Sequence, residues 1–343
     1  MGSELADFSF VLWGGLDSVF FMSIDVKLLG EICKAPGAPG FEIKIRELVL
    51  KELKGLCDEV RVDQMGNVIA LKKGKSNKKK SMAAAHMDEI GFIVSHIDDK
   101  GFVRFNPLGG FDPKTLTAQR VIIHGKKDVV GVMGCKPIHI MTPEERGKKI
   151  ELGDFYIDTG LTKKQLEKII EVGSPITRER ELIELGDCVN VKSLDNRVSV
   201  FILIEALRAI KKSRKKPAYD FYAAFTVQEE VGLRGAISAA HHIDPDFGFG
   251  LDTTIAYDLP GAAAHEKITS LDFKYRTLFL SALINFWKRK ISSPLAIFVF
   301  PSKPFSFKKV SFLYAKFAPL HRKGNLIPNP PTVVPCKLIK SNN

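Results

Sequence analysis

The sequence has few of the features that mark secreted, disulfide-stabilised or membrane-spanning proteins. Its five cysteines are scattered, and no two have C-x-x-C spacing, which argues against a disulfide framework or a cysteine zinc site and favours a reducing, cytoplasmic setting. The stretch that comes closest to a membrane span, residues 277–300, is interrupted by three basic residues and by Pro294, so we expect no spanning helix. Residues 1–21 contain no lysine or arginine and therefore lack the basic start of a secretory signal.

Charge is distributed very unevenly along the 343 residues. The formal net charge is +12, yet residues 1–266 contain 37 Lys and Arg against 38 Asp and Glu, a net charge of −1. Residues 267–343 contain 14 Lys and Arg and a single acid, Asp272, with nine of the 24 phenylalanines and one of the 27 glycines. So sharp a shift indicates a near-neutral globular body followed by a segment of foreign composition. We therefore expect no nucleic-acid partner and no membrane partner, in spite of the basic excess.

The body alternates between patterns typical of helices and of strands. Helices are expected from Asp25, a suitable N-cap, around Ile45–Leu53, and near residues 162–170, 198–210 and 233–240. Strands are expected at 59–63, 68–71, 82–86, 220–227 and 248–251, with a series of short strands at 91–97, 102–105, 120–124 and 129–133. The lysine-rich run at 72–80 is expected to be a solvated loop tip. Strand–helix alternation on both sides of a β-rich middle predicts an α/β domain that carries an inserted β domain.

Two segments place carboxylates beside a histidine or before a helix. His86 and Asp88 follow a small, apolar strand, and their side chains point the same way from an extended chain. An imidazole there can bind a metal while the carboxylate orients it, although a single histidine after a strand is also common as a structural residue. Asp195 precedes the apolar helix expected at 198–210, where it can act as an N-cap or bridge two cations.

Two further segments end apolar strands with acids. Glu229 and Glu230 are flanked by apolar residues, which argues against a solvated acidic loop, because buried carboxylates are costly unless they are paired or bind metal. Neighbouring side chains diverge, so one can bind metal while the other faces the substrate as a general base. Asp252 ends the last strand, as a ligand or as a turn residue. The combined nitrogen and oxygen ligands suit zinc, cobalt or manganese, and a bridging carboxylate suits a two-metal centre.

These segments, in this order and spacing, resemble the tetrahedral (TET-type) dinuclear-metal aminopeptidases. The matching stretches are His-Met-Asp-Glu-Ile-Gly from 86, Asp-Asn-Arg from 195, Val-Gln-Glu-Glu-Val-Gly-Leu-Arg-Gly-Ala from 227 and Leu-Asp-Thr-Thr from 251. The resemblance covers about residues 22–270. It implies a three-layer α/β, zinc-peptidase-like catalytic domain with an inserted β-rich dimerisation domain. It also implies a cytoplasmic enzyme that trims peptides from the N-terminus and a homo-oligomer in which dimers assemble into a tetrahedral dodecamer.

The resemblance further implies which residues bind two divalent metal ions. His86 and Asp252 hold one metal, Glu230 binds the second, and Asp195 bridges the two. Zinc or cobalt is the expected metal.

Two catalytic residues are implied in the same way. Glu229 is the general base that takes a proton from the bridging water and later protonates the leaving amine. Asp88 orients His86. The pair of cations lowers the pKa of the shared water, which then attacks the first peptide carbonyl.

The resemblance stops near residue 270, where the basic, glycine-poor composition begins. The family completes its sheet there with a Gly-rich Thr-Asp-Ala stretch and a final histidine at the second metal. This sequence has neither, and the surroundings of His321, its only later histidine, do not match. We expect a non-native-looking extension (1–21), two parts of the catalytic domain (22–90 and 188–270), the β-rich insertion (91–187) and an atypical basic tail (271–343). A shifted reading frame is one hypothesis for this tail.

Loss of the last histidine predicts weak binding of the second metal and impaired hydrolysis. Among enzymes, the alternative is a related two-metal exopeptidase or deacylase, which a comparison of N-acylated with free-amine peptides would separate. Outside enzymes, the alternative is an inactive or basic-tailed protein that uses residues 267–343 to bind nucleic acid or anionic lipid with a strong salt dependence. The scattered charges of the tail and its lack of a recognition motif argue against this alternative.

Overall fold

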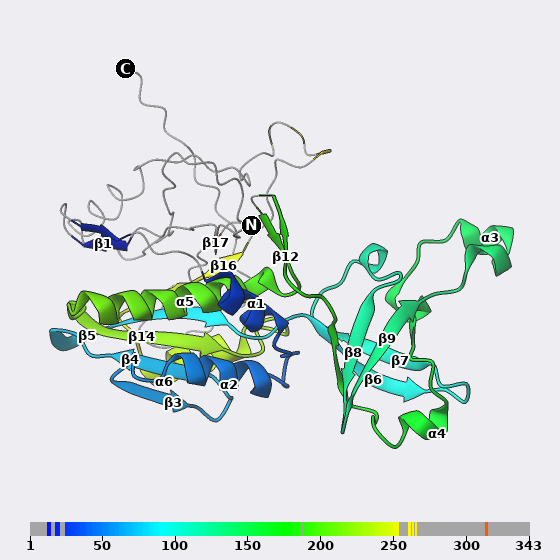
Figure 1. Ribbon diagram of the computed structural model, residues 1–343, viewed down its shortest axis with the longest axis horizontal. Helices are drawn as coiled ribbons and strands as arrows, with labels where there is room; N and C mark the ends of the chain where they lie inside the picture. The colour runs from blue at the N-terminus through cyan, green and yellow to red at the C-terminus, as the bar shows by residue number, and fades with distance from the viewer. Residues whose placement is uncertain are drawn as a thin grey trace, which may run out of the picture.

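The computed structural model describes residues 12–14, 18–20, 25–186, 188–253, 260–261, 263, 265 and 313–314. It consists of a helix-covered β-sheet and a β-barrel that lies beside it (Figure 1). Most of the expected extension and nearly all of the expected basic tail, His321 included, lie outside the described residues. Within the described residues, no helix is long and apolar enough to cross a bilayer.

Five strands form the central sheet, and three of them run parallel. The order is β15 (Phe247–Gly250), β5 (Ser76–His86), β14 (Tyr219–Thr226), β4 (Val68–Lys72) and β3 (Glu59–Val62). β5 pairs in parallel with both β14 and β15, whereas β4 and β3 continue the sheet in antiparallel pairing. The carboxyl ends of β15, β5 and β14 therefore meet at the same edge.

Helices cover both faces of this sheet, which makes the fold three layers deep. Helices α1 (Val26–Lys34), α2 (Ile43–Glu52) and α5 (Leu194–Ser213) share one buried cluster with Val68 and Ala70 of β4. The intervening Ile69 packs on the opposite face with α6 (Arg234–Ile243). Side chains that alternate between two buried faces explain why the strands read as continuous apolar runs. The predicted α/β class and layering are confirmed.

Local signals set the start of the first helix. The Asp25 carboxylate accepts a hydrogen bond from the Leu28 backbone N–H at 2.9 Å, as the N-cap prediction requires. Leu28, Leu29, Ile32 and Cys33 are buried on the inner face of α1. The helix is therefore fixed by a cap at one end and by burial of one face.

The inserted body is a closed barrel of six strands. Its order is β10 (Tyr156–Asp158), β7 (Val103–Leu108), β6 (Gly91–Ile97), β11 (Pro175–Arg178), β8 (Arg120–His124) and β9 (Asp128–Gly134). Phe92 lies at its centre, stacked on Phe111 with ring centroids 4.1 Å apart and edge-on to Phe105. The β-rich character predicted for this segment is confirmed.

Short elements connect and decorate the two bodies. The barrel carries η1 (Pro113–Thr115), η2 (Ile138–Ile140), α3 (Pro143–Arg146), η3 (Leu152–Asp154) and α4 (Lys163–Leu166). A hairpin of β12 (Ile183–Leu185) and β13 (Cys188–Asn190) leads back to α5. Two small pairings complete the description, β1 (Leu12–Gly14) with β2 (Ser18–Phe20) and β16 (Asp252–Thr253) with β17 (Leu313–Tyr314).

Two local predictions were wrong. Residues 76–80 of the lysine-rich run are not a loop tip but the first part of β5, where Lys80 pairs with Asp220 and donates through its ammonium to the Ile243 carbonyl at 2.8 Å. The helix expected at 162–170 ends at Leu166. Tight turns follow it, and they bury Ile170 in the barrel core. In both places tertiary pairing decides the local structure.

The buried face of α5 gives a test of the fold. Ile204→Ala should lower the free energy of unfolding by about 2–5 kcal/mol, because Ile204 is fully buried between α5 and the sheet. Ile237→Ala on the exposed side of α6 is the matched control and should change it by less than about 0.5 kcal/mol. Denaturant titration of both variants measures the difference. Equal effects would contradict the layer arrangement.

Candidate metal centre

Residues from four separate segments meet at the edge where the parallel strands end. His86 is the last residue of β5 and lies in register with Thr226, the last residue of β14. Asp252 follows β15 by two residues, and Asp195 lies in the first turn of α5. The strand ends predicted from sequence to collect acids are thus brought together by the parallel pairing.

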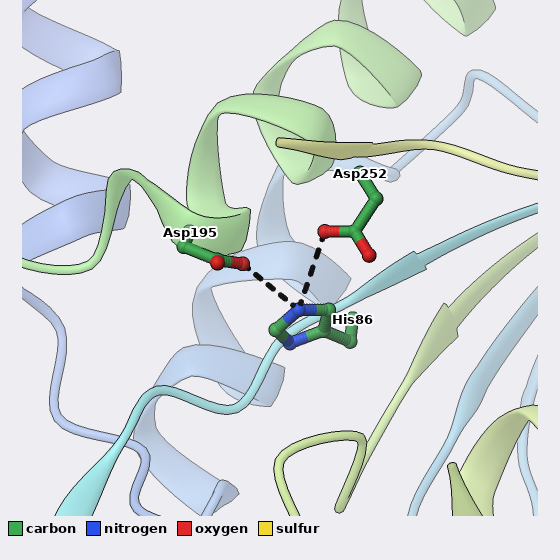
Figure 2. Close-up of side chains that lie close together, drawn as sticks. All are labelled: His86, Asp195 and Asp252. Carbon is green, nitrogen blue, oxygen red and sulfur yellow. Dashed lines mark hydrogen bonds and ion pairs between the residues drawn. The ribbon is translucent and has the colours of Figure 1, made fainter. Parts of the chain in front are cut away.

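Three carboxylates approach the same nitrogen of one imidazole. His86 Nε2 lies 3.2 Å from Asp195 Oδ1, 3.8 Å from Glu229 Oε2 and 3.9 Å from Asp252 Oδ1. Figure 2 shows His86 with Asp195 and Asp252 directed at it from different elements. The imidazole is only 3% exposed, whereas the Asp195 side chain is 59% exposed. The cluster therefore has a buried side, at His86, and an open side, at Asp195.

Asp88 connects the histidine to the pair of glutamates. Its buried carboxylate lies 3.4 Å from His86 Nδ1 and accepts hydrogen bonds from the backbone N–H groups of Glu229 and Glu230, both at 3.0 Å. The His86–Asp88 proximity follows the spacing argument. The two backbone contacts were not foreseen, because sequence spacing says nothing about which loop faces a carboxylate. Asp88 thus fixes both the imidazole and the loop that carries the glutamates.

Glu230 completes a second group of candidate ligands. Ligand atoms of His86, Glu229 and Glu230 lie within 4.8 Å of one another, as do those of His86, Asp195 and Asp252. Burial raises the pKa of Glu230 to about 7, and the negative charges of the other acids contribute although His86 opposes them. The Glu230 carboxyl group therefore takes up a proton more readily than an exposed glutamate does, chiefly because it is buried.

The residues present fit divalent metal ions. Burial disfavours the charged imidazolium of His86, yet hydrogen bonds with Asp195 and Asp88 outweigh it and raise the pKa of His86 well above its usual value. Four acids besides Asp88 crowd this one base, and a divalent cation is the natural counter-charge for such a set. One nitrogen and several carboxylate oxygens are ligands suited to zinc, cobalt or manganese.

Asp195 lies in a distorted first turn of α5. Ser193 occupies the N-cap position of α5 and makes no side-chain capping bond, while Asp195 has non-helical φ and ψ angles within the first turn. The peptide bond between Asp195 and Asn196 is cis. The Asp195 carboxylate points toward His86 (Figure 2).

Several buried charged residues beside the site were missed from sequence. Glu42 accepts hydrogen bonds from the backbone N–H groups of Gly40 at 2.8 Å and Gln228 at 3.2 Å, and its pKa is raised because burial outweighs them. Burial also opposes ionisation of Glu89, but Lys192 and Arg197 outweigh it and lower the pKa of Glu89. The sequence signal for this group was an acid next to Asp88, namely Glu89, and a base on each side of Asp195, namely Lys192 and Arg197.

Comparison with known proteins gives this site a context. The model of the M42 glutamyl aminopeptidase family matches residues 66–277. A provisionally assigned aminopeptidase of Acetivibrio thermocellus is 40% identical over 68% of this chain and 67% of its own length. The lysyl aminopeptidase of Pyrococcus furiosus is 37% identical over the same shares. The chain thus spans about two thirds of the length of these relatives.

Solved structures of aminopeptidases resemble this fold. A TET aminopeptidase from a marine-sediment Thaumarchaeota archaeon superimposes with a TM-score of 0.68 at 37% identity, over 72% of this chain and 70% of that one. The TET1 peptidase of Pyrococcus horikoshii, whose subunits can form a tetrahedron or a large octahedral shell, gives a TM-score of 0.60 at 32% identity over 66% and 68%. The match of the family model ends at residue 277, close to where the sequence changes composition. The chain belongs to the M42 glutamyl aminopeptidase family.

Proposed function

We propose that this chain is a metal-dependent aminopeptidase that removes N-terminal residues from peptides by hydrolysis. The observation that carries the proposal is the convergence of Asp195, Glu229 and Asp252 on the buried His86 at the carboxyl edge of the sheet. Membership of the M42 family supports the reaction class. The buried Cys33 is a free thiol, which fits the cytoplasmic setting expected from sequence.

Each acid has a place in the proposed site. His86 and Asp252 would hold one divalent ion and Glu230 the other, and Asp195, whose ligand atom lies near those of His86 and Asp252, would bridge the two ions. When bound, such ions lower the pKa of water and polarise the scissile carbonyl. Zinc and cobalt are the metals we propose, on the mixed nitrogen and oxygen donors.

Glu229 is the proposed general base. Its carboxylate is partly exposed and lies 3.8 Å from His86 Nε2, close to the candidate ligands yet open to a substrate. It would accept a proton from the attacking water, whose oxygen forms the new bond to the carbonyl carbon. As the peptide C–N bond breaks, Glu229 would return that proton to the leaving amine nitrogen, so that a free amino acid and a shortened peptide result.

Glu229→Gln tests this role. Hydrolysis of aminoacyl-anilides should fall by about 10²–10⁴-fold, because proton transfer in the transition state is lost, while uptake of cobalt should persist. Glu47→Gln on the exposed side of α2 is the control. Retained hydrolysis in Glu229→Gln would exclude this residue as the base. Cleavage of N-acetylated peptides in preference to free-amine peptides would instead favour the deacylase alternative.

We further propose that the two metal positions differ in strength. Among the described residues, His86, Asp195 and Asp252 form one group of candidate ligands for the first position. The second position would depend on the bridging Asp195 and on Glu230. A position held by two carboxylates alone should bind metal more weakly than one that also has an imidazole. Hydrolysis should then be limited by occupancy of the second position, in keeping with the impaired activity expected from sequence.

Cobalt titration calorimetry should resolve a tight step and a weak step for the wild-type chain. Asp252→Asn should weaken the tight step, because it removes a ligand that lies 3.9 Å from His86 Nε2. Glu230→Gln should weaken the other step and leave the tight one, and Glu47→Gln should alter neither. Two steps of equal affinity, or one step lost in both ligand variants, would contradict this division.

The barrel supports a proposal of self-association. Val130 and Val132 of β9 and Ile138 and Ile140 of η2 are exposed, although their side chains are large and apolar. Exposed apolar groups gathered in one segment are typical of interaction surfaces. We infer that the barrel mediates dimerisation, and that dimers assemble into a tetrahedral dodecamer as the relatives' shells suggest.

Val130→Lys combined with Val132→Lys should break the assembly into smaller species, because buried lysines without partners would be costly at the interface. Light scattering coupled to size-exclusion chromatography measures the mass. Glu167→Lys, an exposed change elsewhere on the barrel, should leave it unchanged. An unaltered mass for the double variant would show that β9 is not part of the interface.

A further inference from the structure

A buried charged cluster lies beside the candidate metal centre and has no role in the mechanism above. Glu89, Lys192, Ser193 and Arg197 are all buried. Lys192 Nζ donates to Glu89 Oε1 at 2.6 Å, and Ser193 Oγ donates to Glu89 Oε2. Arg197 Nη2 lies 3.7 Å from Glu89 Oε1. One carboxylate thus contacts three residues of a segment more than a hundred positions away in the chain.

The members of this cluster flank the candidate ligands. Glu89 follows Asp88 and is three residues after His86, whereas Ser193 and Arg197 lie two residues before and two residues after Asp195. The Arg197 backbone N–H also donates to the Ser193 carbonyl at 3.1 Å, which closes the turn around Asp195. The contacts of Glu89 therefore join the end of β5 to the start of α5 at the point where both deliver ligands.

Arg197 connects the cluster to a third segment. Its guanidinium donates to the carbonyls of Ile32 and Ala35, the latter at 2.8 Å. A Cβ atom at Gly37 would lie 2.7 Å from Arg197 Nη2, so the loop after α1 packs directly on this group. The Glu89 backbone N–H donates to the Gly37 carbonyl at 3.0 Å. The cluster thus contacts the loop after α1 as well as the two segments that carry the candidate ligands.

Stability alone is a poor explanation for this arrangement. A buried ion pair has a desolvation cost that its attraction often fails to repay, and apolar residues of similar size are frequently as stable. Directed contacts from both oxygens of a carboxylate instead fix the geometry between two segments. The Asp195 side chain is 59% exposed, so the backbone that carries it has a large part in setting its position.

We propose that Glu89 is a positioning residue of the metal centre, which holds the Ser193–Arg197 turn against the end of β5 and so sets the position of Asp195 relative to His86. The inference rests on the proposed metal centre. Loss of the Glu89 carboxylate should let the turn shift and separate the two ligands. Residues that orient metal ligands typically contribute about 10- to 100-fold to metal affinity.

Glu89→Gln in the full chain is the principal test, with cobalt as the probe. Calorimetry should show affinity weakened about 10- to 100-fold, and the visible absorption spectrum of the bound cobalt should change because its ligand geometry changes. Hydrogen exchange without added metal should show faster exchange of the amides in residues 192–198. Glu205→Gln is the matched control, because Glu205 is a buried carboxylate on the same helix that binds Arg208 at 2.6 Å. It should leave cobalt affinity and spectrum unchanged.

A double variant separates positioning from a general effect on stability. Glu89→Met with Lys192→Met removes the carboxylate together with one of the two cations that Glu89→Gln leaves without a counter-charge, so thermal stability should recover relative to Glu89→Gln. Cobalt affinity should stay low, because Ser193 still lacks its partner. Recovery of affinity together with stability would overturn the inference.

The remaining outcomes also test the positioning role of Glu89. Wild-type-like affinity in Glu89→Gln overturns the positioning role, as does weakened affinity with unchanged exchange at residues 192–198, since the effect would then be one of charge alone. A wild-type chain that takes up no cobalt contradicts the proposed metal centre itself. The exchange comparison still decides in that case whether Glu89 holds the two segments together.

Discussion

Parallel pairing of β5 with β14 on one side and β15 on the other is the constraint on which the rest of this structure depends. The register places His86 opposite Thr226 and Gly250 opposite Ala84. Chain segments that leave these strands must begin at the same edge, and each of them carries an acid within a few residues. The small side chains of Ala83 and Ala85 help to make this possible, because the helices on that face can approach the strand closely.

Bringing the acids together places several negative charges close to one another, and the fold alone does not neutralise them. Four carboxylates besides that of Asp88 surround His86, and the pKa of Glu230 is raised by burial and by its neighbours. Asp88 differs from the others, because its carboxylate is satisfied by His86 and by two backbone N–H groups. The cluster thus contains one acid committed to structure and several whose charge calls for a cation. That division matches the distinction between a residue that orients a ligand and the ligands themselves.

Much of this could be predicted from sequence because the signals were local. Alternation and periodicity gave the strands and helices of the body, and Asp25 gave the start of the first helix. What could not be predicted depends on contacts between distant segments. The role of Lys80 in β5 is set by pairing with β14, and the backbone partners of Asp88 depend on how the loop after β14 folds. In the sequence nothing distinguishes Glu89 from the other acids of its motif, because its partners lie more than a hundred residues away.

The position of the barrel in the chain explains why the contacts of Glu89 with Lys192 and its neighbours matter. Every residue of its six strands lies between Glu89 and Lys192, so the ion pair joins the point where the chain leaves the sheet to the point where it returns. The entropy cost of closing so long a loop grows only slowly with its length, and a directed contact at the base fixes how the ends meet. An insertion anchored in this way can vary in size or bind another subunit without moving His86 against Asp195. The geometry of the site then depends on the sheet and on the Glu89 contacts at its edge, which leaves the barrel free for the part in assembly proposed above.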